Sequence, residues 1–538
     1  MTSRLRAVPP GAVASGLLLT AALPDWNLWP LAFVALVPLL TALEGRGPAE
    51  AARVGLVAGL VHAATTVYWV TYTLRVYGDL PWVVAAAVML LLASYLAAYP
   101  AVWAAGLAYA GRGKAPLPVA ALALAVPLWV GLEWLRSWLL TGFPWMLLGY
   151  SQYRQLALIQ VADLGGVYVV SALLVAANVA LYGLARARAQ GAWRRPAALA
   201  AGAALALGAS LAYGAARLAA LESAGPQAAR TVEVGIVQGN VPQDRKWDPA
   251  FQAETVETYR SLTVDVAGRG ARLVVWPETA VPAFFQRDPR IRPAVLDTAR
   301  RAGVDLVFGA PSAEMRPPRT PEGEPRVVLF NSAYVVGAEG RVKGRYDKQH
   351  LVPFGEYVPL SGLLFFVNKL AQGIGDFEAG RGMPPIEAAG ARLGILICYE
   401  AIFPDLARRM VADGAQVLVN ITNDAWFGRT AAPEQHLAQA VFRAVELKRP
   451  LVRAANTGIS AIVAPSGRID AVLGLFTRGA LTGSIAVPQP DAGASTLYTR
   501  TGDRFAQLCT LAAGVALFLT ARRRRGERPS PAPGEARR

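Results

Sequence analysis

The stretch Arg392-Leu393-Gly394-Ile395-Leu396-Ile397-Cys398-Tyr399-Glu400 places a single thiol at the end of an apolar run. Such a run predicts a buried strand that stops near residue 397, and the segment 403–413 has the composition of a helix. A strand end that turns polar directly after a cysteine can present a nucleophile, although an ordinary buried cysteine fits the same run. Cys398 is therefore a candidate catalytic residue that needs support from the rest of the chain.

The region around this stretch, from about 231 to 490, alternates short apolar runs with polar, helix-compatible segments. Strands are predicted at 232–238, 272–276, 305–308, 327–336, 393–397, 416–420 and 451–454, and helices at 249–266, 289–302 and 433–448. This alternation is typical of an α/β domain. About 260 residues are enough for one domain with its own core.

The first 222 residues have a different composition and predict a membrane domain. The chain of 538 residues is 54% hydrophobic and only 17% charged, and a helix that crosses a bilayer needs about 20 apolar residues. Seven spans are predicted at 7–23, 28–43, 53–73, 81–110, 117–140, 163–185 and 197–221, an eighth at 504–521, and a basic disordered tail at 522–538. The first span is interpreted as an uncleaved helix and not a signal peptide, because a second span follows almost at once.

Basic residues predict the orientation of these spans. One set of short loops is rich in arginine, and the tail adds Arg522 to Arg525, whereas the opposite loops hold only Arg75, Arg136 and Arg154. The positive-inside rule then places both termini in the cytoplasm and the α/β domain outside. These loops explain most of the net charge of +16, and no nucleic-acid recognition motif accompanies it, so nucleic-acid binding is not predicted.

Two further stretches place polar residues at predicted strand ends. Val274-Val275-Trp276-Pro277-Glu278 delivers a carboxylate just past a proline, which ends strand pairing. Lys348 also follows a predicted strand, and Glu356 lies beyond a Pro-Phe-Gly turn. Each residue alone fits an exposed loop, but Glu, Lys and Cys together at strand ends of one domain are a specific signal for nucleophilic catalysis.

The spacing of the cysteines and histidines argues against a disulfide and against a metal site. Cys509, the one other cysteine, lies in the eighth predicted span, so no disulfide with Cys398 is expected. The three histidines, His62, His350 and His436, lack the spacing of metal ligands, and no glycine-rich phosphate loop occurs. The sequence therefore predicts catalysis without a cofactor.

These stretches resemble the carbon-nitrogen hydrolase (nitrilase) superfamily, whose catalytic set is Glu, Lys and Cys. The resemblance covers 231–490 and rests on four runs, at 238–247, 351–357, 398–400 and 423–428. With predicted spans before and after this domain, the whole chain is similar to the apolipoprotein N-acyltransferase family of the bacterial inner membrane. The resemblance implies a polytopic α-helical membrane domain with about eight helices and a periplasmic α/β domain built as an αββα sandwich.

The resemblance also implies a reaction. An acyl chain would pass from a phospholipid, through a thioester on Cys398, to the α-amino group of S-diacylglyceryl-cysteine in an apolipoprotein. Glu278 would be the general base, Lys348 would stabilise the oxyanion and Cys398 would be the nucleophile. Glu356 and Tyr399 would help to position the three catalytic residues, and Glu400 would lie further away. Trp247 and Trp426 would lie on mobile loops that handle acyl chains. A monomer without a cofactor is implied, and core packing is the alternative role for both tryptophans.

Two other functions share parts of this pattern. A membrane-tethered amidase or nitrilase would use the same three residues with water, but a simple anchor needs one span and not eight. A transporter or receptor with an inactive outer domain would be expected to lose at least one of the three. The apolar run 354–370 predicts a hydrophobic flap against the bilayer or a packed insertion, and charge alone suggests phosphate contacts for Lys343, Arg345 and His350.

Overall fold

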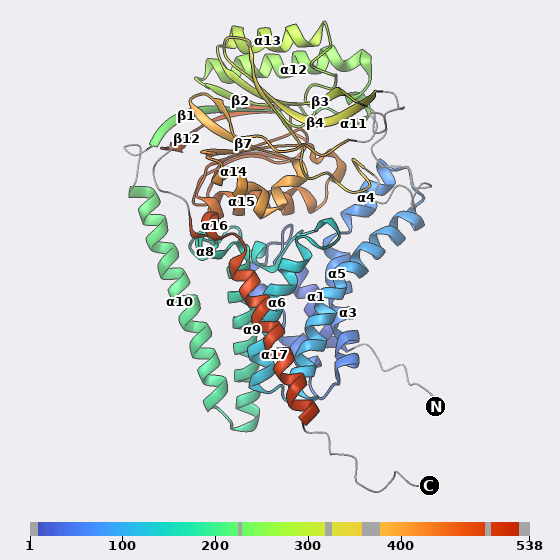
Figure 1. Ribbon diagram of the computed structural model, residues 1–538, viewed down its shortest axis with the longest axis vertical. Coiled ribbons are helices and arrows are strands. Elements are labelled where there is room, and N and C mark those ends of the chain that lie inside the picture. The colour runs from blue at the N-terminus through green and yellow to red at the C-terminus, as the bar shows by residue number, and fades with distance from the viewer. Residues whose placement is uncertain (1–8, 224–228, 318–324, 358–376, 490–495, 527–538) are drawn as a thin grey trace.

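The computed structural model describes residues 9–223, 229–317, 325–357, 377–489 and 496–526. Figure 1 shows an α/β domain stacked on a helical domain along the long axis of the molecule. The predicted flap at 354–370 lies outside the described residues from 358 onward.

The α/β domain contains two six-stranded sheets that face each other. The first sheet has the order β12 (Gly479–Pro488), β1 (Ala229–Gln238), β2 (Leu273–Val275), β3 (Asp305–Arg316), β4 (Arg326–Val336), β5 (Val342–Asp347). The second has the order β11 (Ile469–Leu473), β10 (Ser460–Val463), β9 (Leu451–Ala455), β8 (Val417–Thr422), β7 (Ala391–Ile397), β6 (Ile386–Ala388). All seven predicted strands are present.

Helices cover the outer faces of both sheets. In Figure 1, α12 (Pro249–Gly268) and α13 (Ile291–Ala302) lie over the first sheet, and α14 (Pro404–Ala412) and α15 (Ala432–Leu447) lie under the second. The αββα sandwich that the family resemblance implies is therefore observed. Strand β5 is the strand expected before Lys348, whereas β6, β10, β11 and β12 were not predicted; β6 has only three residues, and β11 and β12 are only partly buried.

Strand direction brings the candidate residues to one edge. Strands β1, β2 and β3 are parallel, and β5 runs the same way because β4 is antiparallel to both β3 and β5. In the second sheet β7, β8 and β9 are parallel. The residues that follow β2, β5, β7 and β8 therefore emerge at the carboxyl ends of the strands, and a 2.9 Å hydrogen bond from Asn423 N to Glu278 Oε2 joins the two sheets there.

The helical domain contains five helices among the described residues that are long and apolar enough to cross a membrane. They are α5 (Trp82–Gly111), α6 (Val119–Arg136), α9 (Val167–Gln190), α10 (Arg194–Ser223) and α17 (Arg504–Gly526). A bent pair, α3 (Pro48–Thr66) and α4 (Trp69–Val76), makes a sixth candidate with a 50° angle. By length and composition, the described residues contain five or six spans, where the sequence predicts eight.

The first two predicted spans form short helices instead. They are α1 (Pro10–Ala22), η1 (Trp29–Phe33) and α2 (Val37–Ala42). A 13-residue helix such as α1 rises only about 20 Å, less than the ~30 Å hydrocarbon core. Pro24, Pro30 and Pro38 interrupt this region, because proline cannot continue a preceding helix.

The last helix is longer than predicted. The tail was expected to be disordered from residue 522, but α17 continues to Gly526 and includes Arg522 to Arg525. Arginine is a good helix former, and cations are favourable at a helix C-terminus. Arg524 also donates to the carbonyl of Tyr109 at 2.9 Å. This end of α17 lies at the end of the helical domain away from the sheets (Figure 1).

Helix α15 lies between the second sheet and the helical domain, and all of its residues except Glu434 are buried. Gln435 accepts a hydrogen bond from Trp145 Nε1 at 2.7 Å and donates to the carbonyl of Pro24 at 3.0 Å. Glu434 forms a 2.8 Å ion pair with Arg154. Helix α15 therefore packs against both the second sheet and the helical domain.

Candidate active site

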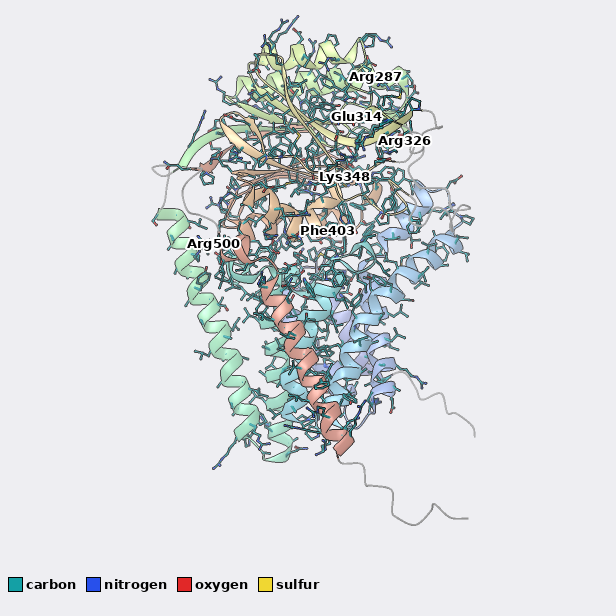
Figure 2. All side chains as sticks on the ribbon, in the orientation of Figure 1. Arg287, Glu314, Arg326, Lys348, Phe403 and Arg500 are labelled. Atoms are coloured by element: carbon teal, nitrogen blue, oxygen red, sulfur yellow. The ribbon has the colours of Figure 1, made fainter. Side chains whose placement is uncertain are left out.

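The nucleophile candidate lies where the sequence predicts it. Strand β7 ends at Ile397, and Cys398 begins the short helix η4 (Cys398–Ile402). Its φ of +52° is the left-handed conformation, which is uncommon for a residue with a Cβ atom. The side chain is buried, with 8% exposed. Figure 2 shows Lys348 inside the α/β domain and Phe403, after η4, on the side toward the helical domain.

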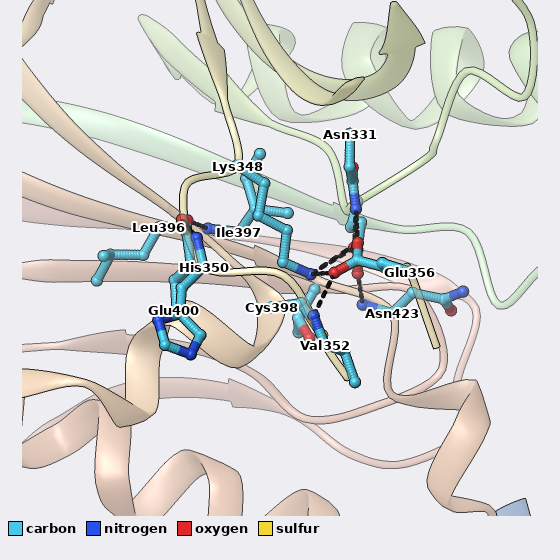
Figure 3. Close-up of polar contacts among 12 residues, drawn as sticks. Asn331, Lys348, His350, Val352, Glu356, Leu396, Ile397, Cys398, Glu400 and Asn423 are labelled. Carbon is cyan, nitrogen blue, oxygen red and sulfur yellow. Dashed lines mark hydrogen bonds and ion pairs between the residues drawn. The ribbon is translucent and has the colours of Figure 1, made fainter. Parts of the chain in front are cut away.

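A buried ammonium connects the two carboxylates of the site (Figure 3). Lys348 Nζ lies 2.9 Å from Glu356 Oε2 and 3.7 Å from Glu278 Oε1. Asn331 Nδ2, from β4, donates to Glu278 Oε1 and Glu356 Oε1, each at 2.7 Å. Because buried charges need partners, this arrangement gives the ammonium of Lys348 carboxylate oxygens on two sides.

Backbone groups fix the position of each carboxylate. Asn423 N donates to Glu278 Oε2, and Val352 N donates to Glu356 Oε2 at 2.8 Å. A second buried lysine, Lys246, donates from Nζ to the backbone carbonyl of Glu278 at 3.1 Å. The carboxylate of Glu278 is thereby held on the edge that also carries Cys398.

Electrostatics keeps the free nucleophile protonated. Burial and the neighbouring Glu278 raise the pKa of the Cys398 thiol to about 12, and Lys348 acts in the opposite direction. Burial alone lowers the pKa of Lys348, but Glu356 and Glu278 raise it well above its usual value. Burial lowers the pKa of Lys246 to about 8. The thiol must therefore lose its proton during attack, which requires an adjacent base.

Glu400 holds the loop of Lys348 against the nucleophile strand. Its Oε2 accepts from Ile397 N at 2.7 Å, and its Oε1 accepts from Gln349 N and His350 N at 2.7 and 3.1 Å. Burial raises the pKa of Glu400 to about 7. Glu400 therefore contacts the backbone of both the nucleophile strand and the Lys348 loop.

Tyr399 points toward the helical domain. Its hydroxyl donates to the carbonyl of Gly142 at 3.3 Å, and its ring lies 5.1 Å from Phe403 and 6.4 Å from Phe143, measured between ring centres. The residue next to the nucleophile therefore contacts a loop between two helices of the other domain.

The two tryptophans lie on different loops. Trp426, in η5 (Asp424–Phe427), has its ring centre 4.8 Å from that of Tyr77, and its carbonyl accepts from Thr73 of α4 at 2.8 Å. Trp247 follows α11 (Gln243–Lys246) and is half-buried beside the buried Lys246. Both loops border the site, and the one with Trp426 is attached to the helical domain.

Two of the three residues suggested from charge alone for phosphate contacts, Lys343 and Arg345, are paired with carboxylates. Lys343 pairs with Asp305 at 2.8 Å, and Arg345 pairs with Asp347 at 2.8 Å and with Glu314. These cations are already neutralised within the first sheet.

Sequence reasoning missed the roles of Asn331, Lys246 and Asn423. Asn331 interrupts the apolar run of β4, and a polar residue in a buried strand was the available signal. Lys246 and Asn423 lie in runs that carried the family resemblance, but no role was assigned to them. Among the described residues, no group of three His, Cys, Asp or Glu side chains is placed to hold a metal ion.

Two sandwiched sheets with Glu, Lys and Cys at one edge define a carbon-nitrogen hydrolase domain, and the sequence model described as Carbon-nitrogen hydrolase matches residues 233–491. The model described as Apolipoprotein N-acyltransferase N-terminal domain matches residues 15–180.

Relatives match the chain over nearly its whole length. The apolipoprotein N-acyltransferase of Geobacter metallireducens is 44% identical over 518 residues, covering 95% of each chain. That of Methylococcus capsulatus is 38% identical over 517 residues, covering 96% of each. The chain belongs to the apolipoprotein N-acyltransferase family, and it is an acyltransferase.

Two solved structures match about half of the chain. An amidase from Nesterenkonia sp. is 22% identical with a TM-score of 0.37, and the match covers 52% of this chain and 97% of that one. A carbon-nitrogen hydrolase from Helicobacter pylori G27 is 16% identical with a TM-score of 0.35, covering 56% and 97%.

Proposed function

We propose that this protein transfers an acyl chain from a membrane phospholipid to the N-terminal α-amino group of S-diacylglyceryl-cysteine in an apolipoprotein. The observation that carries the proposal is the position of Cys398, at one buried edge with Glu278 and Lys348, while the adjacent Tyr399 contacts Gly142 of the helical domain. We expect a membrane lipid to approach this thiol from the side of the helical domain. An enzyme that transferred the acyl chain only to water would not require its nucleophile beside the helical domain.

The first half-reaction forms a thioester. Glu278 accepts the proton of Cys398 as the sulfur attacks the ester carbonyl of the phospholipid, and Lys348 stabilises the oxyanion. The lysophospholipid oxygen then leaves and takes the proton from Glu278. This sequence explains why a thiol with a raised pKa can react, since deprotonation and attack are coupled.

The second half-reaction transfers the acyl chain to nitrogen. The neutral α-amine of the diacylglyceryl-cysteine attacks the thioester carbonyl, and Glu278 accepts the amine proton. The C–S bond then breaks, and the proton returns to the sulfur of Cys398. An amine attacks a thioester more readily than an oxygen ester, which favours a two-step, ping-pong route through sulfur.

The remaining candidate residues support these steps. Glu356 holds the ammonium of Lys348, and Glu400 fixes the loop that carries it. Tyr399 faces the helical domain, where its hydroxyl donates to the carbonyl of Gly142. Trp247 and Trp426 are proposed to contact acyl chains from their loops.

The proposal includes a location and an orientation. The protein would lie in the bacterial inner membrane as a monomer, with a membrane domain at 1–222, a periplasmic catalytic domain at 231–490, a last span at 504–521 and a tail at 522–538. A count of eight spans includes the two short segments near the N-terminus. The arginines at the end of α17, on the side of the helical domain away from the sheets, support cytoplasmic termini.

Intact-mass spectrometry tests the proposal. The full-length protein in detergent is incubated with phospholipid alone, beside Cys398→Ala and, as a matched control, Cys509→Ala. A hydroxylamine-labile gain of one acyl chain is expected in the wild type and in Cys509→Ala but not in Cys398→Ala. A diacylated lipopeptide should discharge it.

The outcome with water separates the alternatives. If water removes the acyl adduct as fast as the lipopeptide removes it, the protein is a membrane-tethered hydrolase. Folded protein that forms no adduct contradicts the proposed acyl donor.

A further inference from the structure

A buried polar cluster lies behind the nucleophile and has no part in the mechanism above. It consists of Asp424 in η5, His436 in α15 and Arg453 in β9, which come from three different elements. Each of these side chains is at most 1% exposed. Buried ionisable groups are costly unless they are paired, so their arrangement calls for an explanation.

His436 contacts the backbone of the nucleophile. Its Nε2 lies 3.1 Å from the carbonyl oxygen of Cys398. A carbonyl oxygen can only accept a hydrogen bond, so Nε2 carries the hydrogen and donates it. The imidazole thereby holds the peptide group that follows Cys398.

Arg453 and Asp424 determine the tautomer of His436. Its Nδ1 lies 3.1 Å from Arg453 Nη2, which can only donate, and 3.2 Å from Asp424 Oδ1. Burial and Arg453 lower the pKa of His436, so the ring is neutral and its Nδ1 accepts from Arg453. The same Nη2 forms a 2.7 Å ion pair with Asp424 Oδ2. The Arg453 guanidinium overcomes the effect of burial and lowers the pKa of Asp424 to about 2, so this carboxylate stays ionised.

The conformation of Cys398 needs this support. A left-handed φ is unfavourable for a residue with a Cβ atom, and it persists only where the surroundings impose it. Glu400 holds the preceding residue, Ile397, through its backbone N at 2.7 Å. His436 holds the following peptide. Hydrogen bonds on both sides therefore fix the turn.

We propose that His436 is a positioning residue, and that its hydrogen bond to the Cys398 carbonyl, oriented by Arg453 and Asp424, holds the nucleophile in the left-handed turn that aims its sulfur at Glu278 and Lys348. The inference rests on the proposed function, since it assigns Cys398 as the nucleophile. His436 acts through the backbone and does not touch the substrate.

Three substitutions test the hydrogen bond. His436→Leu removes the donor, and His436→Asn keeps a polar group that is too short to reach the carbonyl. His436→Gln places an amide N–H close to the position of Nε2. A matched control is Gln439→Leu, because Gln439 is a buried polar residue on the same helix whose amide donates to the carbonyl of Gln435 at 3.2 Å.

Two rates are measured on the full-length folded protein in detergent. One is single-turnover acylation of Cys398 at several phospholipid concentrations, and the other is alkylation of Cys398 by iodoacetamide. Losing one buried hydrogen bond predicts an acylation rate about 10- to 100-fold lower in His436→Leu and His436→Asn, with the half-saturating lipid concentration within about 2-fold of the wild type. Alkylation should slow in both. His436→Gln should restore both rates, and Gln439→Leu should keep them.

Several outcomes would overturn the proposal. Wild-type rates in folded His436→Leu or His436→Asn would show that the hydrogen bond has no positioning role. Rates in His436→Gln as low as in His436→Leu would show that the ring and not the donor matters. If the wild type forms no acyl-enzyme, the proposed function fails, while the alkylation rates still test the role of His436.

Discussion

Replacement of Lys348 by methionine should separate two roles of one buried ammonium. Its Nζ lies 2.9 Å from Glu356 and 3.7 Å from Glu278, and its side chain is 1% exposed. Removing one partner of a buried ion pair typically costs about 3–5 kcal/mol of folding free energy, because charges are left unpaired. Loss of one oxyanion-stabilising group typically lowers the rate ~10²- to 10³-fold.

A second substitution distinguishes these effects. In the double variant Lys348→Met with Glu356→Gln, only Glu278 remains as an unpaired carboxylate, and it keeps its bonds from Asn331 and Asn423 N. The double variant is therefore expected to recover about half of the lost stability, on the order of 2 kcal/mol. The acylation rate should stay low, because no positive charge lies beside the oxyanion.

The assay combines denaturant unfolding in mild detergent with single-turnover acylation, corrected for the folded fraction. Glu356→Gln alone is the control for the second substitution. If the double variant acylates at the wild-type rate, Lys348 is only a structural counter-ion, and its assignment to the oxyanion is refuted.

Three further predictions concern Cys398, Asn331 and Tyr399. Because burial raises the pKa of Cys398 to about 12, its alkylation in the free protein should speed up about tenfold per pH unit from about pH 7 to 9, following the thiolate fraction, and a plateau in that range would contradict the assignment. Asn331→Leu removes two 2.7 Å bonds to carboxylates and should slow single-turnover acylation about 10- to 100-fold, whereas an unchanged rate would argue against a role for this bridge. Tyr399→Phe should change that rate by less than about fivefold, since it loses only one 3.3 Å bond, and a loss as large as that of Cys398→Ala would indicate a direct role of the hydroxyl.

Local patterns were sufficient to predict the three strand ends. Glu278, Lys348 and Cys398 each follow an apolar or strand-like run, so their positions depend on residues within a few places in the sequence. Asn331 and His436 lie inside a strand and a helix. Asn331 contacts Glu356, which is 25 positions away in the sequence, and His436 contacts Cys398, which is 38 positions away. No local sequence pattern contains such contacts.

The helical domain was harder to predict for a related reason. Hydropathy measures the composition of a window, and it does not register that prolines divide the first 43 residues into short helices. Helix α15 was predicted from its pattern, but its burial was not. Glu434, Gln435 and Arg443 resemble solvent-facing residues until the other domain is present to bind them.

The shared position of α15 has a practical consequence for anyone who wants a water-soluble version of this enzyme. Cutting the chain to 229–489 would remove the partners of Gln435 and Glu434 and expose a helix that is covered on nearly every side. The same helix carries His436, whose ring lies against the backbone of the thiol. A truncated enzyme would therefore lose its lipid supply together with the scaffold that shapes its reactive turn, so the smallest useful catalyst is the membrane protein itself.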